Sequence, residues 1–349
     1  MKKKQVTVAM SGGVDSSLCA YILKKKGYDT RGLTMSLYPG SGHVQRAEKV
    51  ADILRIPHRV IDISGQFENK VINNFCCEYI TGRTPNPCLL CNRFIKFGLL
   101  MSKFLPRGGY FATGHYAKVI YEKKNNMYKL QRGGDIKKEQ SYVLYMLNQK
   151  QLARILLPLG NMTKDQIRKK AKQLKLPIDE SDESQDICFI KNQSYIDFIR
   201  SKVKGFKPEP GNIVRLNGQV MGKHKGRIFY TVGQRKGLGI AYKVPLFVFG
   251  FNEKENTVIV AEENELYARA FEIKDVFFTH PGYKKSSFNA AVKIRYHHTA
   301  SRALVTALPN GRFRVKFMQA QKAITPGQGA VFYKRNTVLG GGIITKVCK

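Results

Sequence analysis

An apolar run at residues 6–10 passes directly into Ser11-Gly12-Gly13 and then into a helical pattern at residues 14–26, an order that few folds accommodate. Glycines let the backbone approach phosphate oxygens, and the N-terminus of a helix presents free N–H groups with a favourable dipole. In open α/β sheets, ligands bind where the carboxyl end of a strand meets such a loop. The segment therefore predicts an anion-binding loop after the first strand of a parallel sheet.

Further pairs of a strand and a helix follow the first pair, which is the rhythm of βαβ units. Apolar runs predict strands at residues 30–37, 59–63 and 110–113, and helical spacing predicts helices at residues 44–54, 67–80, 94–104 and 149–156. We expect residues 1–205 to form an α/β catalytic domain with a doubly wound parallel sheet.

The composition of the chain changes near residue 205, where a Lys-Pro-Glu-Pro-Gly sequence at residues 207–211 interrupts any regular element. Short glycine-rich and lysine-rich strands follow, and we expect residues 206–268 to form a small β-rich central domain. Six short alternating strands come last, at residues 271–278, 288–296, 303–308, 312–317, 329–333 and 338–345. Their spacing predicts a small antiparallel β-barrel at residues 269–349.

The 349 residues include 60 Lys and Arg against 25 Asp and Glu, which gives a formal net charge of +35. Neutralising phosphates with Lys and Arg releases condensed counterions, so this charge favours RNA or DNA as a partner, with salt-dependent affinity. The alternative is a general lysine-rich bias that only covers solvated faces. No apolar stretch approaches the roughly 20 residues of a membrane helix, and the first apolar run is too short for a signal peptide. We expect a cytoplasmic protein that binds no membrane.

The loop at residues 11–17 differs from two common phosphate-binding motifs. It lacks the Lys-Ser/Thr pair of the Walker A sequence and the GxGxxG spacing of dinucleotide-binding proteins. Its sequence, SGGVDSS, resembles the PP-loop of ATP pyrophosphatases, which split ATP into AMP and pyrophosphate while adenylating a carbonyl oxygen. The resemblance implies a fold of the adenine nucleotide α-hydrolase type, with ATP and Mg²⁺ as cofactors. Asp15 would help to bind the magnesium.

A CxxC sequence formed by Cys88 and Cys91 lies in a proline-stiffened loop just before a predicted helix. The helix dipole and nearby basic side chains such as Lys96 are expected to lower the pKa of a thiol there, which favours reactivity or metal binding. A third candidate, Cys188, follows in a Cys-Phe-Ile segment. We interpret the remaining cysteines as structural or incidental: Cys19, Cys76, Cys77 and Cys348.

Six motifs in a fixed order make the chain similar to the tRNA-specific 2-thiouridylase family over nearly its whole length. They are SGGVDSS, TPNPxxxCN followed by IKF, TGHYA, a Lys-Glu-Gln-Ser-Tyr run, a CFI cysteine and YTxGQRxGLG. The resemblance implies an ATP-dependent sulfurtransferase that gives 2-thiouridine at the wobble position of the tRNAs for Lys, Glu and Gln. One departure is Cys88, because many members carry an aspartate there.

The resemblance also implies roles for individual residues of this chain. Cys91 matches the family's nucleophilic cysteine, and Cys188 matches the cysteine that carries a persulfide. The ATP site falls on Ala9, Met10, Ser11, Gly12, Gly13, Val14, Asp15, Ser16, Met35 and Gly114. The tRNA contacts fall on Lys138, Glu139, Gln140, Arg295 and Tyr296, and the target-base contact falls on Asn86, Pro87 and Cys88.

Two routes for the sulfur remain open at this point. Cys88, Cys91 and Cys188 could hold an iron–sulfur cluster that leaves one iron free for an exogenous sulfide, which then attacks the activated base. Alternatively, a Cys188 persulfide loaded by a sulfur donor protein delivers the sulfur, with Cys91 as its partner. A zinc site agrees less well with the sequence, because tetrahedral closure requires four ligands.

Two other functions are consistent with parts of the sequence. One is a different PP-loop ATP pyrophosphatase, a synthetase acting on a small molecule, which would need neither the charge of +35 nor a reactive CxxC sequence. The other is a non-catalytic RNA-binding protein with a vestigial nucleotide site, which would not turn over ATP in the presence of tRNA.

Overall fold

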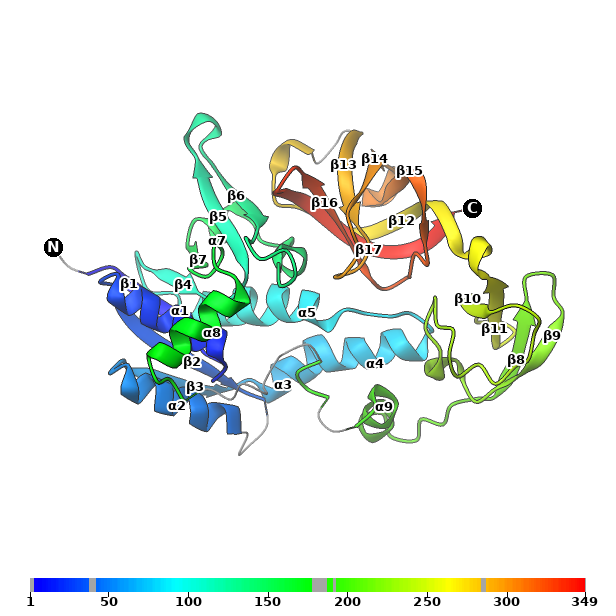
Figure 1. Cartoon of the computed structure of the whole chain (residues 1–349), viewed down its shortest axis with the longest axis horizontal. Coiled ribbons are helices and arrows are strands. Elements are labelled where there is room, and N and C mark those ends of the chain that lie inside the picture. The colour runs from blue at the N-terminus through cyan, green and yellow to red at the C-terminus, as the bar shows by residue number, and fades with distance from the viewer. Residues whose placement is uncertain (1–2, 38–41, 178–186, 191–192, 284–286, 349) are drawn as a thin grey trace.

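The computed structural model describes residues 3–37, 42–177, 187–190, 193–283 and 287–348. Figure 1 shows an α/β domain formed by the N-terminal part of the chain and a β-barrel formed by the C-terminal part. A small β-rich domain lies at the end of the molecule far from the parallel sheet. Among these described helices, none has the length and apolar character needed to cross a membrane.

Five parallel strands form the sheet of the N-terminal domain, in the order β3-β2-β1-β4-β7. They are β1 (Gln5–Ala9), β2 (Asp29–Ser36), β3 (His58–Asp62), β4 (Tyr110–Ala112) and β7 (Ile155–Leu156). Helices α1 (Val14–Lys25) and α2 (Gly42–Ile53) pack on the sheet, and α8 (Lys164–Gln173) packs on α1. Val6 and Val8 on the central strand are fully buried, as expected when both faces of a sheet are covered. The predicted parallel sheet is confirmed.

Two helical segments continue from this sheet toward the small β-rich domain (Figure 1). The first contains α3 (Ser64–Phe67) and α4 (Asn73–Ile80), and the second runs from α5 (Pro87–Leu90) to α6 (Met101–Phe104). The helix expected to start at residue 94 therefore begins earlier. Proline suits the first helical position, and the Asn86 side chain caps the helix by accepting a hydrogen bond from the Cys88 N–H.

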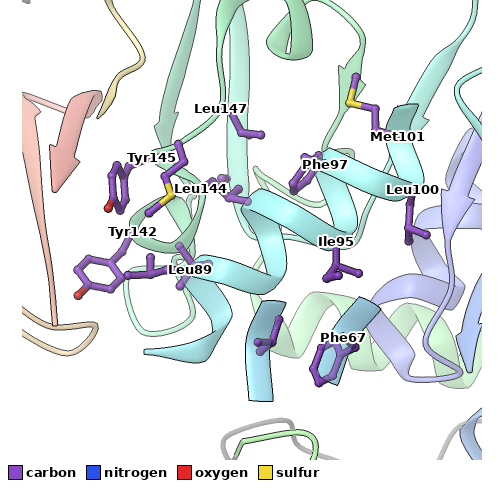
Figure 2. Packing of buried hydrophobic residues seen from close by; sticks show 14 of the residues in the cluster. Phe67, Leu89, Ile95, Phe97, Leu100, Met101, Tyr142, Leu144, Tyr145 and Leu147 are labelled. Carbon is purple, nitrogen blue, oxygen red and sulfur yellow. The ribbon is translucent and has the colours of Figure 1, made fainter. Parts of the chain in front are cut away.

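Both helical segments share one apolar core, shown in Figure 2. Its buried side chains include Phe67, Leu89, Ile95, Phe97, Leu100, Tyr142, Leu144 and Tyr145. The Phe97 ring lies edge-on to Phe111 of β4, with 6.1 Å between the ring centroids. This core therefore ties the cysteine-bearing helix to the parallel sheet.

Two local predictions in the N-terminal domain need correction. The helix expected at residues 149–156 ends early, since α7 spans Gln149–Leu152 and Ile155–Leu156 forms the edge strand β7. Pairing with the neighbouring strand β4 outweighs the helical spacing there. The sequence reasoning also missed a long hairpin, β5 (Ala117–Glu122) and β6 (Met127–Arg132), which projects from the domain in Figure 1.

The small central domain is a four-stranded sheet in the order β10-β11-β8-β9, preceded by α9 (Tyr195–Lys202). Its strands are β8 (Gly211–Arg215), β9 (Val220–His224), β10 (Leu246–Asn252) and β11 (Thr257–Glu262). Fully buried side chains on one face form its own core: Ile213, Val248, Val258 and Val260. The β-rich character predicted for this part of the chain is confirmed.

The C-terminal barrel contains six antiparallel strands, and pairing of β12 with β17 closes it. The strands are β12 (Tyr267–Phe278), β13 (Phe288–Lys293), β14 (Ser301–Ala307), β15 (Phe313–Lys322), β16 (Gly329–Lys334) and β17 (Thr337–Cys348). Along β15, buried Phe313, Val315 and Phe317 alternate with exposed residues, which is the period of two expected for a barrel wall. The predicted antiparallel barrel is confirmed.

The barrel packs directly on the loop that precedes α5. The Thr84 N–H donates to the Pro326 carbonyl at 3.0 Å, and the Gln328 side-chain amide donates to the Thr84 carbonyl at 2.8 Å. Gly327 has φ of +92°, and a Cβ there would lie 2.9 Å from the Thr84 nitrogen, so only glycine fits. The loop before the CxxC sequence is thus held by a segment more than two hundred residues away in the chain.

We expect Phe97→Ala to lower the free energy of unfolding by about 3–5 kcal/mol, because it leaves a cavity in a core that cannot collapse fully. Urea denaturation followed by circular dichroism measures the change. Ile136→Ala is the matched control, since Ile136 is 92% exposed, and it should change the free energy by no more than about 0.5 kcal/mol. Equal losses in the two variants would contradict the assignment of Phe97 to the core.

Candidate active site

The loop between β1 and α1 is folded by its own hydroxyl groups. The Ser16 hydroxyl accepts a hydrogen bond from the Ser11 N–H and donates to the Gly13 carbonyl, both at 3.0 Å. The Ser17 hydroxyl donates to the same carbonyl at 2.9 Å. No side chain caps the N-terminus of α1, because Gly13 occupies the capping position. Its first N–H groups therefore face the loop without a side-chain acceptor, as an anion-binding site requires.

Two glycines allow other segments to approach this loop closely. Gly12 has φ of +73°, and a Cβ there would lie 2.4 Å from the His43 carbonyl oxygen at the start of α2. A Cβ on Gly114 would lie 2.8 Å from the carbonyl carbon of Asp15. The His43 ring in turn contacts the Met35 carbonyl at 2.9 Å. The structure thus brings the loop, Met35 and Gly114 together at the carboxyl ends of three neighbouring strands, β1, β2 and β4.

Asp15 lies in the first turn of α1, and both of its carboxylate oxygens are engaged. Lys164 Nζ donates to them at 2.8 and 2.9 Å, and the Tyr116 hydroxyl donates to Oδ1 at 2.6 Å. Burial, followed by the charge of Asp15, raises the pKa of Tyr116 well above its usual range, so the hydroxyl remains a donor. The sequence reasoning missed Tyr116 and Lys164 as partners of Asp15, and no spacing in the sequence connects Lys164 with the loop.

The cysteine-bearing loop leads into α5, where Cys88 lies in the first turn and Cys91 directly follows the last residue, Leu90. Cys88 is exposed and Cys91 is partly exposed, while Cys188, from a separate segment, is exposed. The charges of Cys188 and of Cys88 each act on the ionisation of Cys91, so both thiols lie within electrostatic range of it. The structure thus places the three cysteines that the sequence singled out in the same region of the molecule.

The prediction of a lowered thiol pKa is wrong for Cys91. Burial of its sulfur, although the residue as a whole is partly exposed, raises the pKa to about 12, and the charge of Lys96 only partly offsets this effect. Burial of the sulfur also raises the pKa of Cys88, although that residue as a whole is exposed, and Lys96 again acts in the opposite direction. Both thiols are therefore protonated at neutral pH in this arrangement.

Cys88 and Cys188 lie within electrostatic range of Cys91, but the three cysteines do not form a ligand set. Across the ranges of the chain that the structure describes, no group of three or more His, Cys, Asp or Glu side chains is placed to hold a metal ion. His115 is buried, with its Nδ1 at 2.7 Å from the Thr113 hydroxyl, and burial lowers its pKa well below the usual range. His115 is thus a neutral structural group beside the site.

The residues expected to contact tRNA lie on both sides of the contact between the α/β domain and the barrel. Glu139 is buried, with Lys293 Nζ of the barrel at 3.8 Å from its Oε2. Gln140 accepts a hydrogen bond from the Tyr116 N–H at 3.0 Å, while Arg295 is exposed. Glu139 therefore connects the α/β domain with the barrel, and Gln140 attaches its own loop to Tyr116.

Tyr296 connects the barrel with the cysteines. Burial, then Glu139, then Cys88 raise its pKa to about 12, which places its ring within electrostatic range of the Cys88 thiol. Lys293 Nζ lies 5.6 Å from the Tyr296 ring centroid and 5.8 Å from that of Tyr142. Lys293 and Tyr296 of the barrel thus lie against Tyr142 of the α/β domain, and Tyr296 also lies within electrostatic range of Cys88.

Because the pKa of Cys91 is raised, we expect its alkylation by iodoacetamide to be slow at pH 7. The rate should rise about tenfold for each pH unit up to pH 11, since only the thiolate reacts. Lys96→Met removes the charge that favours the thiolate, so it should slow the reaction further. Peptide mass spectrometry measures the rates, with exposed Cys77 as the internal control. A rate that is already maximal at pH 7 would contradict the raised pKa.

Three family descriptions match successive parts of the chain: a tRNA methyl transferase HUP domain at residues 4–192, a tRNA methyl transferase PRC-barrel domain at residues 197–262 and an aminomethyltransferase β-barrel domain at residues 268–344. Among solved structures, a 4-thiouridine synthetase in complex with RNA and ATP has a TM-score of 0.34 and 16% identity, covering 49% of this chain and 40% of its own. That likeness is too low to carry an argument.

Full-length relatives are much more similar. The tRNA-specific 2-thiouridylase MnmA of Desulforudis audaxviator is 46% identical over 341 residues, covering 97% of this chain and 98% of its own. The protein of the same name from Acetivibrio thermocellus is 42% identical and covers 99% of this chain and 100% of its own. MnmA 2 of Thermoanaerobacter sp. strain X514 is also 42% identical, with 99% of each chain covered. This chain belongs to the tRNA-specific 2-thiouridylase family.

Proposed function

We propose that this protein is a tRNA-uridine 2-sulfurtransferase that uses ATP to convert the wobble uridine of the tRNAs for Lys, Glu and Gln into 2-thiouridine in the cytoplasm. The observation that carries the proposal is that Cys88 and Cys188 lie within electrostatic range of Cys91, and Tyr296 of the barrel within range of Cys88, in a chain whose glycine loop leads into a helix without a side-chain cap. The full-length family relatives support the same reaction.

The first chemical step activates the base. The oxygen on carbon 2 of a uridine flipped out of its stack attacks the α-phosphorus of ATP, which forms an adenylate and expels pyrophosphate. The N-terminus of α1, with Gly12 and Gly13, would hold the leaving pyrophosphate through backbone N–H groups. Mg²⁺ would be held by the phosphates and by Asp15, and it would offset their negative charge.

The second step replaces the oxygen. The terminal sulfur of a Cys188 persulfide attacks carbon 2, and AMP leaves with the original oxygen. Cys91 then gives up its proton and attacks the Cys188 sulfur, which breaks the sulfur–sulfur bond and releases 2-thiouridine. The product is a disulfide between Cys91 and Cys188, which an external thiol must reduce before the next turnover.

The persulfide route agrees better with the arrangement of the thiols than a cluster does. The described residues provide no set of three converging ligands, so we derive no step through iron. A sulfur donor protein would load Cys188, which is exposed, whereas sulfide alone would require a cluster to hold it. Cys88 would then serve the target base together with Asn86 and Pro87, without the carboxylate found in many relatives.

Several surfaces could hold the tRNA. Lys138 and Arg295 are next in sequence to Glu139 and Tyr296, which lie at the contact between the α/β domain and the barrel. In the central domain, a hollow is lined by residues 235–246, among them Arg235 and Lys243. The net charge of +35 supports phosphate contacts over a wide area. A small-molecule synthetase would need none of these surfaces, and a non-catalytic RNA-binding protein would need no grouped thiols.

We expect the protein, purified without oxygen, to thiolate unmodified tRNA with ATP and a persulfide-generating donor. Cys91→Ser and Cys188→Ser should each reduce the rate at least a thousandfold, because each removes a reacting sulfur. Cys88→Ala should retain activity within about tenfold. Sulfur incorporation into tRNA, AMP release and bound iron are measured on the same preparations.

Matched controls separate this proposal from its rivals. Cys77→Ser changes an exposed thiol away from the grouped cysteines and should leave the rate unchanged. If activity and iron are lost together in Cys88→Ala, the cluster route holds and the persulfide route fails. If ATP is consumed only with a small molecule, or not at all with tRNA present, the sulfurtransferase proposal itself fails.

A further inference from the structure

The Asp15 carboxylate lies at the mouth of a loop built to bind anions, where an unneutralised negative charge would repel a triphosphate. Lys164 neutralises it with two hydrogen bonds, at 2.8 and 2.9 Å. The Lys164 side chain is 13% exposed and that of Asp15 is 33% exposed, so the pair is only partly screened by water. In this state the group that neutralises the Asp15 carboxylate is therefore the ammonium group of Lys164.

The Lys164 backbone is fixed more firmly than its side chain. Lys164 is the first residue of α8, whose N-terminus is closed by a capping box between Thr163 and Gln166. Its N–H donates to Asp135 Oδ2 at 2.9 Å. The four-carbon side chain ends beside α1, and it can turn from Asp15 toward the adjoining loop without moving the helix.

Asp135 also anchors the loop that carries the expected tRNA contacts. Its Oδ1 accepts hydrogen bonds from the N–H groups of Lys137 at 3.0 Å and Lys138 at 3.3 Å. At the other end of this loop, the Gln140 N–H donates to the Tyr116 carbonyl at 2.9 Å, and the Gln140 side chain accepts from the Tyr116 N–H. Residues 135–140 are therefore attached at both ends to groups that also position Asp15 and Lys164.

We propose that Lys164 is an exchangeable counter-charge, paired with Asp15 in the empty site and with the β- and γ-phosphates when ATP binds, and that this exchange couples nucleotide binding to the tRNA-contacting loop at residues 135–140. When the ammonium group moves to the phosphates, Asp15 becomes free to bind Mg²⁺. The loop at residues 11–17 therefore has few unpaired charges near it both before and after ATP binds. Lys164 is thus a nucleotide-binding residue.

The coupling follows from the shared attachments. A change in the Asp15–Lys164 pair acts on Tyr116 through its hydroxyl, and the Tyr116 backbone holds the loop at 135–140 through its two hydrogen bonds with Gln140. If ATP changes the affinity for tRNA by this path, tRNA changes the affinity for ATP by the same factor. This inference rests on the proposed use of ATP and tRNA, and it adds the residue that connects the two sites.

The first test measures the binding of α,β-methylene-ATP with Mg²⁺, and separately of AMP, by calorimetry. Lys164→Met should raise the dissociation constant of the ATP analogue at least tenfold and that of AMP less than twofold, because AMP lacks the phosphates that Lys164 contacts. Lys164→Arg should recover most of the affinity. Equal losses for both ligands would show a merely structural role, and no loss for either would show that Lys164 stays with Asp15.

The second test measures the dissociation constant of unmodified tRNA with and without the analogue. The ratio of the two constants should differ from one by at least fivefold in the unaltered protein, and by less than twofold in Lys164→Met. A ratio near one in the unaltered protein, or an unchanged ratio in Lys164→Met, would overturn the coupling.

Lys202→Met is the matched control for both tests. Lys202 also makes two hydrogen bonds to one carboxylate, that of Glu68, at 3.1 and 2.8 Å, and it is similarly half-buried. It should leave the binding of the analogue, of AMP and of tRNA unchanged. If the unaltered protein thiolates tRNA and binds the analogue but Lys164→Met behaves like Lys202→Met, only this inference fails. If the unaltered protein does not bind the analogue at all, the proposed function fails first.

Discussion

The part of the candidate active site that two domains share depends on the hydrogen bonds that join the Thr84 backbone to Pro326 and Gln328. They attach the barrel to the start of the cysteine-bearing loop, and Gly327 allows the two backbones to meet. On the barrel side, Tyr296 lies within electrostatic range of Cys88. The contact between the two domains is made partly by backbone groups, which substitutions leave in place, and partly by the Gln328 side chain.

The electrostatic surroundings of Asp15 and of Cys91 differ within this candidate active site. Around Asp15, charges are paired by close partners on a rigid frame, which suits a site that must accept and release a highly charged nucleotide. Around Cys91, burial keeps the thiol protonated, and Lys96 supplies only partial compensation. A protonated thiol is protected from oxidation until a partner and substrate are in place. The protein thus combines a thiol of low reactivity at Cys91 with closely paired charges around Asp15.

Much of the architecture could be predicted from the sequence. The first strand, the glycine loop and the following helix were predictable because strand length, glycine and helical spacing all agree. The six barrel strands were predictable because their buried residues alternate, as in β15. The edge strand β7 was not, since its two residues gain strand geometry only from pairing with β4. Of the candidate site, the cysteines could be found from their motifs, but Lys164 and Lys293 are joined to Asp15 and Glu139 only by the folded chain.

The hairpin of β5 and β6 extends the barrel's sheet rather than its own domain's sheet. Gln131 of β6 pairs with Thr337 of β17, and the Arg132 N–H donates to the Asn336 carbonyl at 2.9 Å. The boundary between the N-terminal domain and the barrel in the sequence is thus not a boundary in space, because the N-terminal domain contributes two strands, β5 and β6, to the C-terminal sheet. A barrel transplanted without this hairpin would leave the edge of β17 near Thr337 without its present partner, so the two domains are coupled at this edge.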